Sequence, residues 1–281
     1  MHNMKLSTLD HEKLLSIMLS NEILFNGTLI ELGGSATSIF SERVVEVPWL
    51  AQKLKLYKPK KLLDIGISLC DQGLMNIYFS SELNDIDMTF IDIIDSSKLI
   101  DRVPEEWREK FLKLNQVEAD FLNYKFNGTF DAISCISTLE HFGFDSPNLD
   151  ETKKKGVFDR SESPYELISK RNTEIDINFL NSCHNNLSEN GKLLLTLPVG
   201  SGGEIQYKDS MGLYAKSYEF NSEALETLLS SSLFSVVEET YFKHDKVLGW
   251  IKAEDSSALS DQSANLMPHA LGVGLFALKK I

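Results

Sequence analysis

The chain has 281 residues, of which 42% are hydrophobic and 25% are charged, and these values are typical of globular proteins. Its formal net charge of −13 is the opposite of the basic balance that nucleic-acid binding needs, and an anionic membrane surface would also repel it. We therefore expect no nucleic-acid partner and no membrane insertion.

The cysteines and the N-terminal sequence bear on the compartment. Cys70, Cys135 and Cys183 are isolated in the sequence and odd in number, so they cannot form a complete disulfide framework. Isolated thiols fit a reducing compartment. Early acidic residues leave no apolar signal-peptide core, and no run approaches the about 18 apolar residues of a membrane span. We expect a cytoplasmic protein.

Short apolar runs alternate with amphipathic stretches along the chain. In chain order, the predicted helices cover residues 8–24, 45–56, 104–114, 174–187 and 222–232, and the predicted strands cover residues 61–65, 87–92, 117–120, 130–136, 192–197, 234–242 and 270–278. Residues 143–173, 200–217 and 249–268 are polar and predict irregular structure, the first as an inserted loop or lid. The alternation predicts βαβ units and a mostly parallel sheet that is covered on both faces.

Turn chemistry that suits a ligand follows the first predicted strand. Asp64 lies near the end of this strand and Gly66 follows two residues later. Ligands of open α/β sheets bind beyond the carboxyl ends of strands, and a glycine there lets the backbone approach closely. A dinucleotide site would need three glycines in a G-x-G-x-x-G loop and no acid that repels a pyrophosphate. The pattern therefore favours a ligand with a cationic end and no phosphates.

The segment 63–73 resembles the first motif of class I S-adenosylmethionine-dependent methyltransferases, which reads E/D-x-G-x-G-x-G. Asp64 and Gly66 match this motif, whereas Ser68 and Cys70 replace its second and third glycines. Serine is small enough to keep the loop close to the cofactor.

Four further segments resemble the same family, in the family's order. Asp92 ends the second predicted strand, and Glu118-Ala-Asp-Phe121 follows the third. Residues 130–141 resemble the family's F-D-x-V…L-E-H stretch, and residues 187–198 resemble its L-x-P-G-G-x-L stretch, with Glu-Asn in place of Pro-Gly. Together with the first motif, these segments span residues 61–199.

The resemblance implies a Rossmann-like class I methyltransferase fold of the α/β class, with a seven-stranded, mostly parallel sheet, one antiparallel strand and helices on both faces. We expect residues 270–278 to be the antiparallel strand, because residues 249–268 hold no convincing crossover helix. It also implies a single domain over residues 1–281. Its parts are an N-terminal helical cap (1–58), a cofactor-binding core (59–200) that contains the inserted loop or lid (143–173), and a C-terminal substrate-side part (201–281).

The same resemblance implies S-adenosylmethionine as cofactor and S-adenosylhomocysteine as product. It implies that Asp92 binds both ribose hydroxyls, since a carboxylate accepts two hydrogen bonds at once, and that Asp120 takes the adenine amino group. The expected cofactor-binding residues are Asp64, Gly66, Ser68, Asp92, Asp120, Phe121 and Ser137. No His, Asp or Glu set stands at metal-ligand spacing, so we expect no metal.

The acceptor side is assigned by position. His141 follows the fourth predicted strand, where the reacting methyl group should point, and is the expected general base. Arg43 is expected to bind a substrate phosphate or the cofactor carboxylate. Tyr207, Lys208 and Tyr214 are expected to line the acceptor pocket.

Residues 41–49 and 198–201 resemble segments of methyltransferases from bacterial surface-polysaccharide (capsule or O-antigen) clusters. This likeness implies O-methylation of a small polar acceptor, such as a sugar or a phosphate or phosphoramidate group of a capsular polysaccharide. A non-catalytic cofactor-binding subunit, a small-molecule methyltransferase outside polysaccharide metabolism, a nicotinamide oxidoreductase and an aminopropyl transferase remain alternatives. The sequence does not indicate the oligomeric state.

Overall fold

The computed structural model describes residues 42–66, 79, 83, 85–93, 100, 103, 105–144, 161–167, 170–172, 174–208, 213–245, 249–265 and 270–281. The predicted helix at 8–24, Ser68, Cys70 and most of the inserted loop lie outside these residues. The division of the domain into cap, core, lid and substrate-side part stays a prediction.

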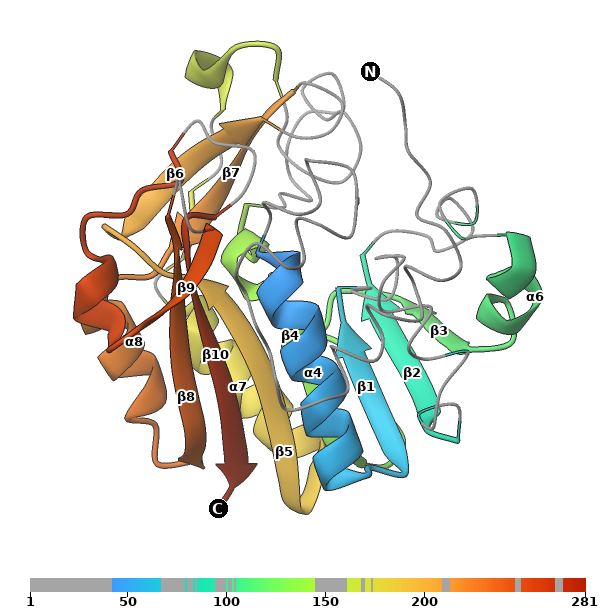
Figure 1. The fold of residues 1–281 in the computed structure, drawn as a ribbon. Coiled ribbons are helices and arrows are strands. Elements are labelled where there is room, and N and C mark those ends of the chain that lie inside the picture. Colours follow the sequence, from blue (N-terminus) through green and yellow to red (C-terminus); the bar gives the residue numbers. More distant parts are fainter. Residues whose placement is uncertain are drawn as a thin grey trace.

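An eight-stranded sheet forms the centre of the molecule (Figure 1). Its strands in chain order are β1 Lys61–Ile65, β2 Asp87–Asp92, β3 Asn115–Glu118, β4 Phe130–Ile136, β5 Leu187–Pro198, β8 Phe234–Asp245, β9 Gly249–Ala253 and β10 Gly272–Lys280. They lie in the order β3-β2-β1-β4-β5-β10-β8-β9. Neighbours from β3 to β5 are parallel, whereas β10 is antiparallel to β5 and β8, and β9 is antiparallel to β8.

This topology confirms the expected Rossmann-like class I methyltransferase fold, with β10 inserted antiparallel between β5 and β8. The strand count is corrected from seven to eight, and the number of antiparallel strands from one to two, because residues 249–253 form the edge strand β9, which is antiparallel to β8, instead of irregular structure. A five-residue edge strand whose single large buried side chain is Trp250 gives little periodic signal in the sequence.

A two-stranded antiparallel hairpin replaces the irregular structure expected for residues 200–217. It consists of β6 Gly203–Lys208 and β7 Tyr214–Glu219. Side chains of β7 alternate between buried and half-buried, as a strand requires, but the buried positions hold Ala215, Ser217 and Glu219. Polar residues at two of these buried positions, Ser217 and Glu219, hide the alternation on which a strand prediction depends.

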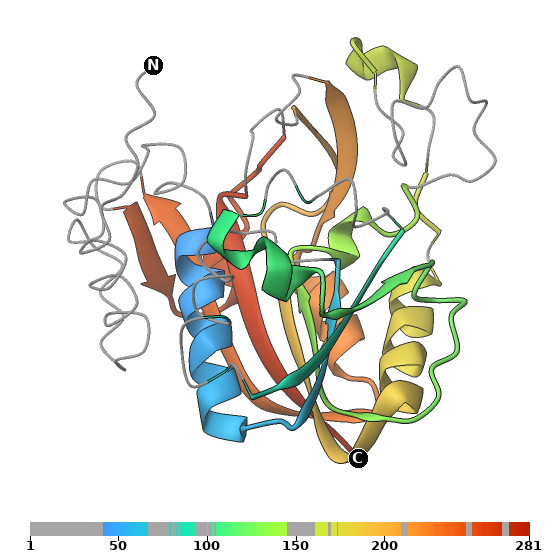
Figure 2. The same ribbon diagram turned by 90° about the vertical axis from the view of Figure 1, so that its right-hand side faces the viewer.

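Helices cover both faces of the sheet. Figure 2 shows α4 Arg43–Tyr57 on one side and α7 Ile175–Asn186 on the other. The remaining elements are α8 Ser222–Leu229, which packs in the core on the α7 side, α6 Arg108–Phe111 and the 3-10 turns η3 Glu105–Trp107, η4 Leu139–His141, η5 Pro164–Glu166 and η6 Ser256–Leu259. The helix expected at 104–114 is therefore two short pieces, η3 and α6. None of the described helices is both long and apolar enough to cross a membrane.

Two hydrophobic clusters hold these layers together. On the α4 side, Leu50 and Leu54 are fully buried with Phe90 of β2. On the α7 side, Phe179 and Cys183 are fully buried with core residues of the sheet and of α8. Burial raises the pKa of the Cys135 and Cys183 thiols, which are free, so both act as small apolar residues.

Candidate active site

The carboxyl ends of β1, β2, β4 and β5 meet at one edge of the sheet, and the first turn of α4 lies beside this edge (Figure 1). Arg43 Nη1 lies 3.5 Å from the carbonyl oxygen of Ile136, the last residue of β4. Residues that follow parallel strands converge at such an edge, which is where open α/β sheets bind ligands. We refer to it as the carboxyl edge.

Asp64 and Gly66 shape the turn after β1. Asp64 is fully buried, and its Oδ1 accepts a 2.6 Å hydrogen bond from Ser134 Oγ on β4. Gly66 has φ +85°, and a Cβ atom there would lie 2.2 Å from Thr138 Cγ2. Only glycine combines this left-handed conformation with so close an approach. The pair therefore fixes the start of the loop that the sequence assigns to the cofactor.

Asp92 lies at the carboxyl end of β2 and is half-buried. Its carbonyl oxygen accepts a 2.9 Å hydrogen bond from the Ala119 N–H, which ties the end of β2 to the segment after β3. Asp64 and Asp92 thus belong to neighbouring parallel strands at the same edge. This is the arrangement that the sequence predicts for a ribose-binding carboxylate.

Asp120 and Phe121 follow β3. Asp120 is exposed, and its carboxylate accepts hydrogen bonds from the Leu122 N–H (3.0 Å) and from Asn123 Nδ2 (2.5 Å), so it also stabilises its own turn. Phe121 is buried, with its ring centroid 5.8 Å from that of Phe179 on α7. The contact of Phe121 in the structure is with the core, and cofactor contacts of both residues stay predictions.

Ser137, which the sequence predicts as a cofactor ligand, belongs to a polar network with Glu46 and Thr196, which it does not predict. Its Oγ donates to Glu46 Oε1 (2.5 Å), and its N–H donates to Thr196 Oγ1 (3.0 Å). Thr196 Oγ1 in turn donates to the same Glu46 oxygen (2.6 Å). Glu46 is fully buried between Val45 and Val47, so an acid within the apolar stripe of α4 was the signal that could have revealed it.

Arg43 is paired inside this network. Its Nη1 donates to Glu46 Oε2 at 3.1 Å, and its side chain is 31% exposed. The guanidinium is thus partly neutralised by Glu46, and its expected role as an anion clamp stays a prediction.

Two further carboxyl groups lie beside the network and were not predicted. Glu140 is 4% exposed, and Glu42 and Glu140 each have a buried Oε2 atom with no hydrogen-bond partner among the described residues. Burial, with the nearby Glu46 charge, raises the pKa of Glu42 to about 7. Burial likewise raises the pKa of Glu140 well above its usual range. We call Glu42, Glu46 and Glu140 the carboxyl cluster.

His141 is at the end of η4, directly after the carboxyl cluster residue Glu140. Its side chain is 28% exposed, and its Nε2 lies 3.9 Å from Glu140 Oε1. Its ring centroid lies 5.7 Å from that of Tyr207 on β6. The structure therefore brings together two residues that the sequence assigned to the acceptor side.

Tyr214 and Lys208 are register partners in the hairpin. Tyr214 also exchanges two backbone hydrogen bonds with Ser161, which ties part of the inserted segment to β7. The side chain of Lys208 and the whole of Ser68 lie outside the described residues. Their expected roles, and that of Tyr214, stay predictions.

Arg171, also missed from the sequence, holds η4 in place. Its guanidinium donates to the carbonyl oxygens of Leu139 (3.2 Å) and Phe142 (3.3 Å), at the two ends of η4. It also forms a bidentate pair with Asp176 at 2.6 and 3.2 Å and lies 4.6 Å from the Tyr218 ring centroid. One side chain thus joins the His141 turn to α7 and to the hairpin.

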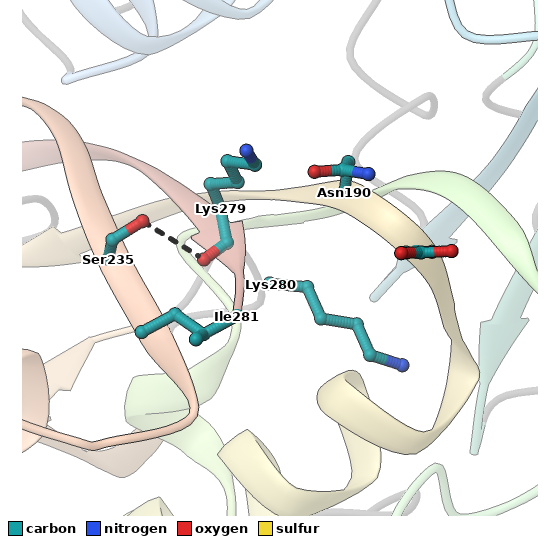
Figure 3. Close-up of a pocket in the computed structure, with 6 residues that line it drawn as sticks. Asn190, Ser235, Lys279, Lys280 and Ile281 are labelled. Carbon is teal, nitrogen blue, oxygen red and sulfur yellow. Dashed lines mark hydrogen bonds between the residues drawn. The ribbon is translucent and has the colours of Figure 1, made fainter.

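A hollow of about 400 Å³ lies at the opposite, amino-terminal edge of the sheet (Figure 3). It is lined by Glu189, Asn190, Ser235, Lys279, Lys280 and Ile281. Lys280 Nζ donates to the backbone carbonyls of His184 (2.6 Å) and Leu187 (2.7 Å), so this ammonium group ties the C-terminal strand β10 to the end of α7. This hollow is remote from the carboxyl edge. Across the part of the chain that the structure describes, no group of three or more His, Cys, Asp or Glu side chains could hold a metal ion.

Comparison with protein-family models gives no match, and comparison with curated proteins gives none either. Solved structures do resemble the fold. The 1,6-didemethyltoxoflavin-N1-methyltransferase of Burkholderia thailandensis, with S-adenosylhomocysteine bound, is 13% identical, with 84% of this chain and 78% of that chain covered and a TM-score of 0.48. The N-methyltransferase NodS of Bradyrhizobium japonicum, also with S-adenosylhomocysteine, is 13% identical, with 96% and 98% covered and a TM-score of 0.46.

A third solved structure is an S-adenosylmethionine-dependent methyltransferase from Clostridium acetobutylicum. It is 10% identical, with 90% of this chain and 95% of that chain covered and a TM-score of 0.47. At this level of identity, the likeness assigns no activity and no substrate to the chain.

Proposed function

We propose that this chain is an S-adenosylmethionine-dependent methyltransferase that binds its cofactor at the carboxyl edge. The observation that carries the proposal is the left-handed Gly66 turn, pressed against Thr138, between the two strand-end acids Asp64 and Asp92. These residues match the family's motif in type and spacing, and they stand at the strand ends that the fold provides for a ligand.

The donor set fits the cofactor's chemistry. A half-buried carboxylate at Asp92 can accept hydrogen bonds from both ribose hydroxyls, and Asp120 stands at the end of the neighbouring strand for the adenine amino group. The carboxyl edge is rich in acids, which suits a donor that carries a positive sulfonium group. It suits a pyrophosphate poorly, so the edge favours this cofactor over a nicotinamide dinucleotide.

When bound, the cofactor supplies an electrophilic methyl group. The chain then holds the acceptor in line, and such alignment lowers barriers by about 7–11 kcal/mol. His141, half-buried in η4 beside Tyr207, takes the proton of an acceptor hydroxyl. Arg171 keeps η4 in position for this step through the Leu139 and Phe142 carbonyls.

We further propose a small polar acceptor such as a sugar hydroxyl. The polysaccharide setting, and a reaction in the cytoplasm, rest on the sequence resemblance of residues 41–49 and 198–201 and on the isolated thiols. A phosphate or phosphoramidate acceptor is less favoured at this edge, because Arg43 is already paired with Glu46 and lies within the electrostatic reach of Glu42 and Glu140. An uncharged or basic acceptor suits these surroundings better.

Calorimetry with S-adenosylhomocysteine tests the proposal. Wild-type protein should bind this ligand and not NAD. Asp92→Ala should weaken binding by about 1.5–3 kcal/mol, since two ribose hydroxyls lose a charged acceptor. The matched control is Asp87→Ala, which removes an exposed acid from the opposite end of the same strand and should bind as wild type does. Absence of binding by wild type, or equal affinity in a folded Asp92→Ala variant, would contradict the proposal.

A further inference from the structure

The carboxyl cluster contains more hydrogen-bond acceptors than the described side chains satisfy. The oxygens of Glu46 accept from Ser137, Thr196 and Arg43. The Oε2 atoms of Glu42 and Glu140 are buried and accept no hydrogen bond from the described residues. Native proteins rarely leave buried acceptors of this kind without a donor, because the loss of hydration is not offset.

The carboxyl groups of Glu42 and Glu140 both feel the charge of Glu46, and Glu140 also feels that of Glu42. These negative charges raise the cost of ionising both groups, and Arg43 opposes the effect only in part. Glu140 is only 4% exposed, and it immediately precedes His141 in η4. The Glu140 oxygen without a donor therefore belongs to the residue directly before the one that we assign as the base.

We propose that Glu42 and Glu140 bind an organic ammonium group at the carboxyl edge. An ammonium group brings three N–H donors and one positive charge, so it supplies both the donors and the charge that these buried oxygens lack. A hydroxyl brings a single donor, and a phosphate would be repelled. The inference rests on the proposed function, because it takes this edge as the place of methyl transfer.

Two molecules at this edge can bring such an ammonium group. One is the acceptor, which would then be an amino sugar or another amine-bearing molecule. The other is the cofactor, through the ammonium end of its amino-acid tail. In both cases the bound cation favours the ionised carboxylates, so binding near neutral pH releases protons from groups that burial otherwise keeps protonated.

The experiment uses the full chain, the isosteric variant Glu140→Gln and the control Glu189→Gln, which changes an exposed acid at the opposite edge. The first arm compares S-adenosylhomocysteine with its analogue that has hydrogen in place of the α-amino group, by calorimetry in buffers of different ionisation enthalpy. The second arm titrates methylammonium into protein saturated with S-adenosylhomocysteine, by NMR.

If the cofactor is the source, wild type and Glu189→Gln should prefer S-adenosylhomocysteine over the analogue by about 10–100-fold, with proton release, and Glu140→Gln should lose that preference. If the acceptor is the source, both ligands should bind alike, and methylammonium should bind to the saturated wild type and not to Glu140→Gln. Glu42→Gln repeats each arm should Glu140→Gln fail to fold.

Binding of S-adenosylhomocysteine without an amino-group preference and without methylammonium binding would overturn the ammonium site and leave the proposed function standing. Failure of wild type to bind S-adenosylhomocysteine would instead overturn the proposed function. In that event, methylammonium titrated into the free protein still decides whether the carboxyl pair binds an ammonium group.

Discussion

At the scale of single residues, His141 and Glu42 show how position and burial set the chemistry of this edge. His141 is half-exposed beside Tyr207, as a group that exchanges a proton with an acceptor must be. Glu42 is instead held where its charge is disfavoured by burial and by Glu46.

His141→Ala should lower kcat with a hydroxyl acceptor by about 10²–10⁴ and leave S-adenosylhomocysteine affinity nearly unchanged, because only proton transfer is lost. The rate of methyl transfer and the calorimetric affinity check the two halves. His184→Ala, a substitution on α7 far along the chain from η4, serves as control. A wild-type rate in His141→Ala would remove this residue from the mechanism.

The raised pKa of Glu42 predicts a pH-dependent stability. In the unfolded chain a glutamate ionises near pH 4.5, whereas in the folded chain Glu42 ionises near pH 7. Over this window the unfolded state gains ionisation that the folded state lacks, so the free energy of unfolding falls as the pH rises.

Glu42→Gln removes this group. The free energy of unfolding of the variant, taken relative to that of wild type, should therefore be about 1–3 kcal/mol higher at pH 8 than at pH 4.5. Urea unfolding at the two pH values measures it, with Glu189→Gln as a variant that should follow wild type. A Glu42→Gln profile parallel to that of wild type would show that Glu42 ionises normally in the folded protein.

At the scale of elements, the Arg171 side chain joins the turn η4, the helix α7 and the strand β7. It connects η4 to α7 through Asp176 and lies against Tyr218 of β7, and its side chain is 6% exposed. Arg171→Met keeps much of the aliphatic volume but leaves two carbonyls and a carboxylate without their donor. We expect it to lower the free energy of unfolding by about 2–4 kcal/mol.

Hydrogen exchange separates this effect from a general loss of stability. In Arg171→Met, the amides of residues 139–142 should exchange faster relative to those of β4, because η4 loses its anchor. Asp176→Asn, which keeps the carbonyl contacts of Arg171, should show a smaller change at η4. Equal protection of η4 in Arg171→Met and wild type would contradict the anchoring role.

The sequence predicts those elements whose pattern is local. β1, β2 and β4 have the predicted bounds, because buried parallel strands are short apolar runs that end in turn residues. The hairpin β6–β7 and the strand β9 were missed, since two of the three buried positions of β7 hold the polar side chains Ser217 and Glu219, and β9 is a short edge strand. The helix predicted at 104–114 is interrupted, and its Leu112 is 61% exposed in the turn that follows α6.

At the scale of the whole molecule, the site divides into two kinds of residue. Asp64, Gly66 and Asp92 stand directly after or at the ends of strands, so a motif in the sequence is enough to propose them. Glu46, Glu140 and Arg171 become a site only through contacts between distant segments, such as the hydrogen bond from Thr196 to Glu46 across 150 residues. Glu46 has a local signal, because it lies between two valines of α4, but no local pattern distinguishes Glu140 or Arg171 from an exposed charged residue.

A crystal structure of the protein with S-adenosylhomocysteine tests the central claim most directly. We predict that the ligand lies across the carboxyl ends of β1, β2 and β3, with both ribose hydroxyls on the Asp92 carboxylate, the backbone of Gly66 against the ligand and the sulfur atom directed toward His141. A ligand bound elsewhere, such as in the hollow beside Lys279 and Lys280, or a ribose without contact to Asp92, would contradict the account.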